Sequence, residues 1–113
     1  MGWKRTGVPP SVLSEGVLHG TTVEARPVLL LRLAGEVRAL DGLCPHLGGD
    51  LSEGTLDAGK LTCPFHGATF EVTTGAVRAD PFGVAPPEGA VGPLVTFPVR
   101  VVDGQVEVDL PDA

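Results

Sequence analysis

The sequence predicts one all-β domain over residues 1–113, and its length and composition support this fold class. Sixteen glycines and eleven prolines among 113 residues provide for many turns, and short valine-rich runs lie between them. Hydrophobic residues make up 42% of the chain and aromatic residues only 4%, so we expect a core of valine, leucine and alanine. We expect antiparallel base sheets from residues 1–41 and 80–113, with a small β subdomain from residues 42–79 inserted between them.

The strands of the first base segment follow from hydrophobic periodicity and turn residues. Trp3 is expected at the start of a first strand, and residues 17–23 are enriched in β-branched side chains, which favours a second strand. Residues 28–33 are mostly apolar and bounded by turn residues, which predicts a buried central strand. Residues 36–40 alternate polar and apolar side chains and predict a half-buried strand, joined to the central one by a hairpin turn at residues 34–36.

The second half of the chain is expected to hold shorter strands joined by turns. Residues 57–60 and 103–104 carry the Asp and Gly residues of hairpin turns. Residues 79–92 are rich in proline, glycine and alanine, so we expect irregular structure there. Strands are expected at residues 55–56, 70–73, 95–102 and 105–110.

Two short loops contain both cysteines and two of the three histidines. Cys44 and His46 are spaced C-x-H, and after 16 intervening residues Cys63 and His66 are spaced C-x-x-H. Thiolates and imidazoles together suit zinc or an iron–sulfur cluster. Structural zinc sites usually draw like ligands in pairs. Here each loop supplies one cysteine and one histidine, as a two-iron cluster with two histidines on one iron and two cysteines on the other requires.

At these loops the sequence resembles the Rieske [2Fe–2S] family, and the resemblance extends over most of the chain. It implies one Rieske-type [2Fe–2S] cluster, with the Cys44 and Cys63 thiolates on the inner iron and His46 and His66 on the outer iron. The alternatives are another metal, or inert cysteines with ordinary hydrogen-bonded histidines. The third histidine, His19, is expected on the surface or on an edge strand rather than as a further ligand.

Five other residues of the two loops are expected beside the cluster. Gly48, Gly49 and Gly67 would let backbone amides approach it, unless they are ordinary turn glycines. Leu47 and Phe65 would shield it from water, although family members frequently carry tryptophan at the second of these positions. A further expectation is that the irregular segment 79–92 either covers the cluster or is a surface connection.

The identities of Ala68 and Phe70, which follow the second histidine, imply a low reduction potential. High-potential family members carry a serine and a tyrosine there, and their hydroxyls donate hydrogen bonds to the cluster's sulfur atoms. Ala68 and Phe70 stand at those positions and cannot donate, so the reduced cluster is less stabilised. We therefore expect a potential toward the low end, roughly −150 mV, of the range of Rieske centres.

The formal net charge of −6 indicates which kinds of binding partner are compatible with this protein. It argues against nucleic acid or an anionic membrane as a partner. The negative charge would steer this protein electrostatically toward a basic docking face on another protein, or it only keeps the protein soluble. Asp50, Glu53 and Asp80 lie near the motif and are either part of a docking face or solvated charges. The longest apolar run, residues 28–31, is too short to span a membrane and no secretory signal is visible, so a cytoplasmic location is expected.

The resemblance implies a soluble Rieske-type ferredoxin, which carries one electron from a flavin-dependent reductase to a terminal oxygenase acting on aromatic rings. Such a protein is not itself an enzyme. An oxygenase would need a second domain with a mononuclear iron, and only His19 remains unassigned. The alternatives are the small Rieske-like subunit of an assimilatory nitrite reductase, or a redox-sensing or structural Rieske subunit of a larger complex.

Overall fold

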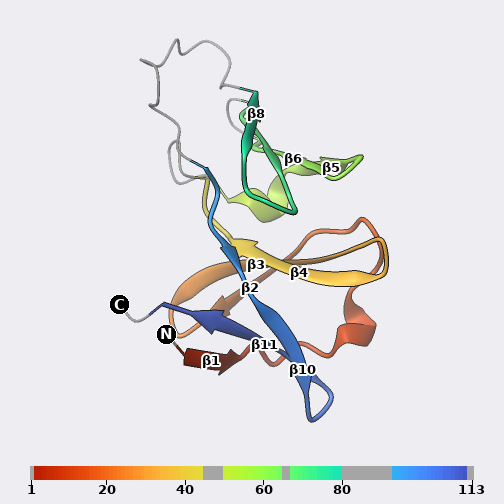
Figure 1. Ribbon diagram of the computed structural model, residues 1–113, viewed down its shortest axis with the longest axis vertical. Helices are drawn as coiled ribbons and strands as arrows, with labels where there is room; N and C mark the ends of the chain where they lie inside the picture. The colour runs from red at the N-terminus through yellow and green to blue at the C-terminus, as the bar shows by residue number, and fades with distance from the viewer. Residues whose placement is uncertain (1, 45–49, 65–66, 80–92, 112–113) are drawn as a thin grey trace.

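Three antiparallel sheets make up the structure, two in a base and a smaller third at one end of the molecule (Figure 1). The computed structural model describes residues 2–44, 50–64, 67–79 and 93–111. The predicted all-β fold with antiparallel sheets is confirmed. The division of the chain at residues 42 and 79 stays a prediction.

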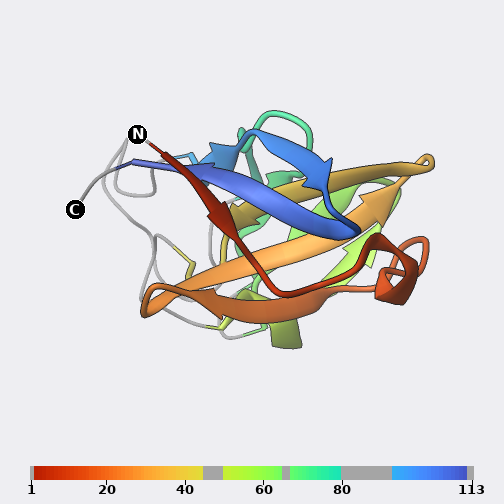
Figure 2. The same ribbon diagram turned by 90° about the horizontal axis from the view of Figure 1, so that it is seen from below.

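The base joins the beginning of the chain to its end. One of its sheets has the order β1-β11-β10 and consists of Gly2–Arg5, Gln105–Leu110 and Val99–Val102. The other has the order β2-β3-β4-β9 and consists of His19–Val23, Arg26–Leu33, Glu36–Asp41 and Thr96–Phe97. A 3-10 turn, η1 (Pro10–Val12), lies between β1 and β2. Figure 2 shows β10 and β11 lying across β3 and β4, so the base has two layers.

The third sheet lies beyond β3 and β4 in Figure 1. Its strands, in the order β5-β6-β7-β8, are Thr55–Asp57, Lys60–Thr62, Thr69–Glu71 and Val77–Ala79. A second 3-10 turn, η2 (Leu51–Glu53), precedes it. The strand expected at residues 70–73 begins and ends earlier, as β7, and the short strand β8 was not predicted at all. β8 has three residues, too few to show a periodicity in the sequence, and its pairing with β7 defines it as a strand.

In the described part of the chain, four hairpins turn through two residues that both have positive φ, the geometry whose twist matches that of paired strands. Three of the four contain glycine, which adopts this conformation without strain, and these three were predicted. The fourth joins β2 to β3 without a glycine and was missed. The turn residues are Glu24-Ala25, Ala34-Gly35, Ala58-Gly59 and Asp103-Gly104.

The strand expected over residues 95–102 is divided at Pro98. This residue has no backbone N–H and cannot continue a ladder as a donor. Before it, β9 pairs with β4 in one base sheet; after it, β10 pairs with β11 in the other. Pro98 therefore marks the point where the chain passes between the two layers, and its carbonyl oxygen accepts a hydrogen bond of 3.0 Å from Asp109 N–H.

The central strand β3 is buried on both faces, as the apolar run predicted. Val28 and Leu30 lie in a cluster between the two base sheets. Leu29 and Leu31, on the opposite face, lie in a second cluster that extends into the third sheet. The second cluster also contains Leu40, Cys44, Leu51, Leu61, Cys63, Ala68, Phe70, Val72 and Leu94. This strand therefore carries the core of the base and the core of the third sheet.

We expect Gly75→Ala to lower the free energy of unfolding by about 1–3 kcal/mol more than Gly104→Ala. Both glycines have positive φ, so alanine is strained at each. A Cβ at Gly75 would in addition overlap the carbonyl oxygen of Leu94, whereas at Gly104 no described atom beyond the two chain neighbours lies within 4 Å of a Cβ. Urea unfolding of both variants measures the difference, and equal losses would contradict the close approach.

Candidate metal centre

The first cysteine follows the end of β4 at the base of a closed loop. Gly42 N–H donates to the Pro27 carbonyl oxygen on β3 at 3.0 Å, and Leu51 N–H donates to the Gly42 carbonyl oxygen at 3.0 Å. Leu43 and Asp50 form an antiparallel bridge on either side of the loop. The chain thus leaves the base at Cys44 and returns to nearly the same place.

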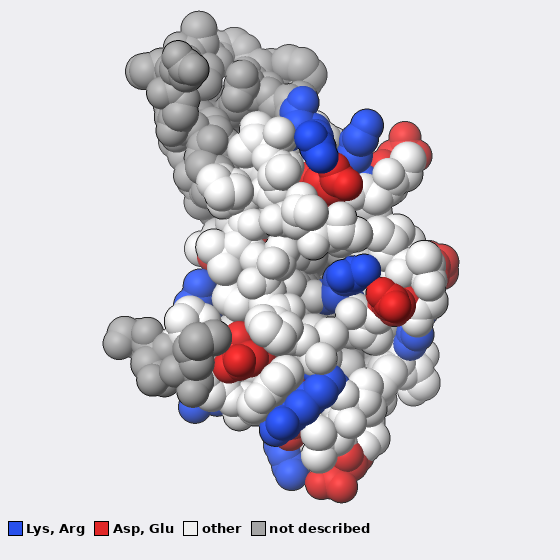
Figure 3. All heavy atoms as spheres, in the orientation of Figure 1, with Lys and Arg blue, Asp and Glu red and all other residues white. Residues whose placement is uncertain are grey.

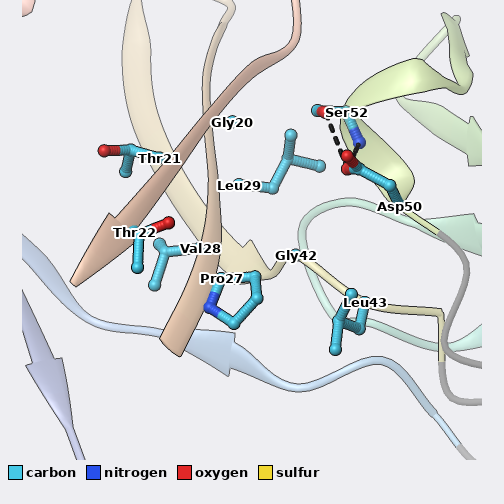
Figure 4. Close-up of a pocket in the computed structure, with 10 residues that line it drawn as sticks. All are labelled: Gly20, Thr21, Thr22, Pro27, Val28, Leu29, Gly42, Leu43, Asp50 and Ser52. Carbon is cyan, nitrogen blue, oxygen red and sulfur yellow. Dashed lines mark hydrogen bonds between the residues drawn. The ribbon is translucent and has the colours of Figure 1, made fainter. Parts of the chain in front are cut away.

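Two glycines let the stem of this first loop lie against β2 and β3. A Cβ at Gly42 would come within 2.9 Å of the Pro27 carbonyl carbon, and a Cβ at Gly20 within 2.8 Å of Ser52 Cβ. Figure 4 shows these residues around a pocket of about 320 Å³, with Asp50 and Ser52 on the side opposite β2. The Asp50 carboxylate accepts hydrogen bonds from the N–H and the hydroxyl of Ser52, at 3.0 and 2.7 Å. It therefore caps η2 and holds the returning chain.

The second cysteine follows β6 directly and is held by backbone hydrogen bonds of its own loop. Cys63 N–H donates to the Ala68 carbonyl oxygen at 2.8 Å, and Gly67 N–H donates to the Cys63 carbonyl oxygen at 3.2 Å. Gly67 has φ +77°, a conformation that favours glycine. Its amide faces Cys63 in this structure, which fits the turn-glycine alternative. Its role beside a cluster stays a prediction.

The two cysteines lie in one apolar cluster and have the properties of soft metal ligands. Their exposed fractions are 2% for Cys44 and 3% for Cys63, and neither forms a disulfide. Ala68 and Phe70 belong to the same cluster and are fully buried. Two buried thiols, one three residues after β4 and one directly after β6, fit the inner iron of a two-iron cluster, which needs two thiolates shielded from water.

The remaining predicted site residues fall into two groups. His19 lies half-buried on β2, an edge strand, where it pairs with Leu30, in keeping with the expectation of an edge-strand position. Outside the described residues lie His46, Leu47, Gly48, Gly49, Phe65 and His66, together with Asp80 and nearly all of the segment expected to cover the cluster.

Charged side chains are mostly paired over the surface. Figure 3 shows positive and negative side chains next to each other on the base and on the third sheet. Ion pairs connect Lys4 to Glu24, Arg26 to Asp41, Arg38 to Glu36, and Arg78 to Glu71, and Arg5 and Arg100 to Glu107. Within the described ranges, no ion pair involves Asp50 or Glu53, so the proposed docking role of these two residues stays open.

Comparison with known proteins agrees with this geometry. The sequence matches the Rieske [2Fe-2S] domain over residues 5–98. The ferredoxin component of the naphthalene 1,2-dioxygenase system of Pseudomonas putida is 32% identical over 100 residues, which are 88% of this chain and 88% of that protein. The Sphingomonas yanoikuyae B1 ferredoxin has a TM-score of 0.80 at 30% identity, covering 97% of this chain and 100% of that one. This chain belongs to the Rieske [2Fe–2S] domain family.

A third comparison concerns a complex between two redox proteins. A chain in the structure of reduced oxygenase with oxidized ferredoxin in carbazole 1,9a-dioxygenase has a TM-score of 0.76 at 32% identity. The match covers 94% of this chain and 91% of that one. The family assignment confirms the predicted cofactor, a Rieske-type [2Fe–2S] cluster. Among the residues described, no helix has the length and apolarity needed to cross a lipid bilayer.

Sequence reasoning missed two features of this site. One is the pair of threonines on β6 and β7, Thr62 and Thr69, which face each other and contact the second cysteine loop. The spacing of Thr55, Thr62 and Thr69 by seven residues was a visible signal, but it acquires meaning only once the strand register is known. The other is the close approach at Gly20, which lies far from the motif in sequence.

We expect Ala68→Ser to raise the reduction potential, and Ala68→Ser with Phe70→Tyr to raise it further. Both residues lie in the apolar cluster that holds the two thiols, and a hydroxyl introduced there is a donor toward sulfur. Voltammetry of the purified proteins measures the shift. The matched control is Ala39→Ser, a buried alanine in the other core cluster. An equal shift in the control, or none in a well-folded Ala68→Ser protein, would contradict the explanation.

Proposed function

We propose that this chain is a Rieske-type ferredoxin that takes one electron from a flavin-dependent reductase and passes it to a terminal oxygenase of aromatic compounds. The observation that carries the proposal is the placement of two buried thiols in a domain that matches ferredoxin components along most of its length. The complex of oxygenase and ferredoxin in carbazole 1,9a-dioxygenase supports the choice of an oxygenase as one partner.

We infer that Cys44, Cys63, His46 and His66 are the cluster ligands. When bound, a Rieske-type cluster supplies one-electron chemistry in which the protein makes and breaks no covalent bond. The described residues contribute shielding and positioning. The apolar cluster keeps water from the two thiols. The Gly42 hydrogen bond ties the first loop to β3, and the bonds among Cys63, Gly67 and Ala68 close the second loop. A site mounted on paired strands keeps its ligands in place when the charge changes.

The cytoplasm is the compartment that we propose. Thiolates that bind a metal cluster must stay reduced until the cluster is assembled, and the cytosol keeps thiols reduced. Neither cysteine forms a disulfide in the structure. The net charge of −6 supports a partner with a basic docking face, since opposite charges speed the encounter of two proteins.

We expect Cys63→Ser and His66→Ala each to abolish the visible absorption of the iron–sulfur cluster and to reduce bound iron to near zero. The control is His19→Ala, because this histidine lies on β2 in the base and is not an expected ligand. Iron and sulfide analysis after anaerobic reconstitution measures the effect. Full retention of both elements in either ligand variant would refute the ligand set.

The experiment that tests the function is a redox titration followed by electron paramagnetic resonance. We expect a one-electron Rieske signal with a potential toward roughly −150 mV, and elution of the native protein free of a stoichiometric partner. A high potential would instead indicate a quinol-linked chain. A cluster-free protein in a stable complex would favour the nitrite reductase subunit or a structural Rieske subunit.

A further inference from the structure

Three threonines form a row across the third sheet, next to the second cysteine loop. Thr55 is opposite Thr62 in the β5–β6 pairing, and Thr62 is opposite Thr69 in the β6–β7 pairing. Leu61 and Phe70, the next pair along, point to the other face and are fully buried in the apolar cluster. The sheet thus has one face in the core and one face with hydroxyl groups.

Two of the hydroxyls, those of Thr62 and Thr69, form a chain of hydrogen bonds that ends on the second cysteine loop. The Thr69 hydroxyl donates to the Gly67 carbonyl oxygen at 3.2 Å, and the Thr62 and Thr69 hydroxyl oxygens are 3.2 Å apart. A hydroxyl has one proton to donate. Because Thr69 uses its proton on Gly67, Thr62 is the donor in the contact between the two threonines. Each bond in such a chain polarises and strengthens the next.

This hydrogen-bonded chain fixes the Gly67 carbonyl oxygen, to which no backbone N–H of the described residues donates. Gly67 N–H is held by the Cys63 carbonyl oxygen, and the loop is closed by Cys63 N–H on the Ala68 carbonyl oxygen. Those two hydrogen bonds join backbone groups and do not depend on the side chains. The bond to the Gly67 carbonyl oxygen depends on a hydroxyl at Thr69. A pocket of about 310 Å³, lined in part by Thr62, Cys63 and Gly67, gives water access to the same region.

We propose that Thr69, supported by Thr62, is a positioning residue that sets the geometry and the electrostatic environment of the second ligand loop. The inference rests on the proposed function, in which Cys63 and His66 hold the cluster. The hydroxyl proton offsets the negative end of the Gly67 carbonyl dipole, which makes the reduced, more negative state of the centre easier to reach. It also holds the Gly67 peptide against solvent in the neighbouring pocket, which slows loss of the cluster.

The test compares four variants of the full, cluster-loaded chain. Thr69→Val removes the hydroxyl and keeps the shape and strand preference of the side chain. Thr69→Ser keeps the hydroxyl, and Thr62→Val removes only the supporting donor. The matched control is Thr55→Val, because this residue belongs to the same row and the described residues show no hydrogen bond from its hydroxyl to the loop. Voltammetry measures the potential, and decay of visible absorption in a chelator measures cluster loss.

We expect Thr69→Val to lower the potential and to speed cluster loss about two- to tenfold, the range that one hydrogen bond corresponds to. Thr62→Val should move both quantities in the same direction by less, while Thr69→Ser and Thr55→Val stay near wild type. Wild-type values in Thr69→Val would overturn the inference, as would equal shifts in Thr55→Val. If Thr69→Val fails to take up a cluster, Thr62→Val and Thr69→Ser decide. Failure of the proposed function is distinguishable from failure of this inference, because the wild-type protein itself would then lack a Rieske signal.

Discussion

The burial of β3 on both faces is the constraint on which the rest of the structure depends. Successive side chains of a strand point to opposite sides, so Val28 and Leu30 need one apolar cover and Leu29 and Leu31 need another. The β1–β11–β10 sheet supplies the first cover. The third sheet, together with Cys44, Leu51 and Ala68, supplies the second. A slip of one residue in the register of β3 would exchange the two faces, so its pairings with β2 and β4 fix both cores together.

Cys44 and Cys63 are therefore parts of the core as well as proposed ligands of the cluster. Cys44 follows β4 by three residues and Cys63 follows β6 directly, and each loop is closed by backbone hydrogen bonds at its base. The first loop rests on β2 and β3 through the contacts at Gly20 and Gly42, and the second rests on the β6–β7 pair. Apolar packing around Cys44 and Cys63 excludes water and holds them in place. With the proposed ligand set, cluster binding would be coupled to the stability of the third sheet, because both thiols lie in its core.

Ion pairs, rather than apolar contacts, hold together the outer face of the β1–β11–β10 sheet. Glu107 is a buried carboxylate on β11, contacted by Arg100 at 2.8 Å and by Arg5 at 3.5 Å. The Arg100 guanidinium also lies over the Trp3 ring, 4.2 Å from its centre. This group ties β1 and β10 to β11 between them, so the two ends of the chain complete one sheet. A buried carboxylate is tolerated here because two guanidinium groups compensate it.

The sequence by itself determined the features that depend on residues close together in the chain. The C-x-H and C-x-x-H spacing indicated the cofactor. The turn residues predicted the hairpins that contain glycine, and the apolar run of β3 predicted a strand buried on both faces. Only the tertiary structure decided which strands pair and in which register. The passage between sheets at Pro98, the strand β8, the turn at Glu24-Ala25 and the meeting of Thr62 with Thr69 all depend on it. Local turn chemistry acts within a few residues, whereas these contacts require distant segments to be packed against a common core.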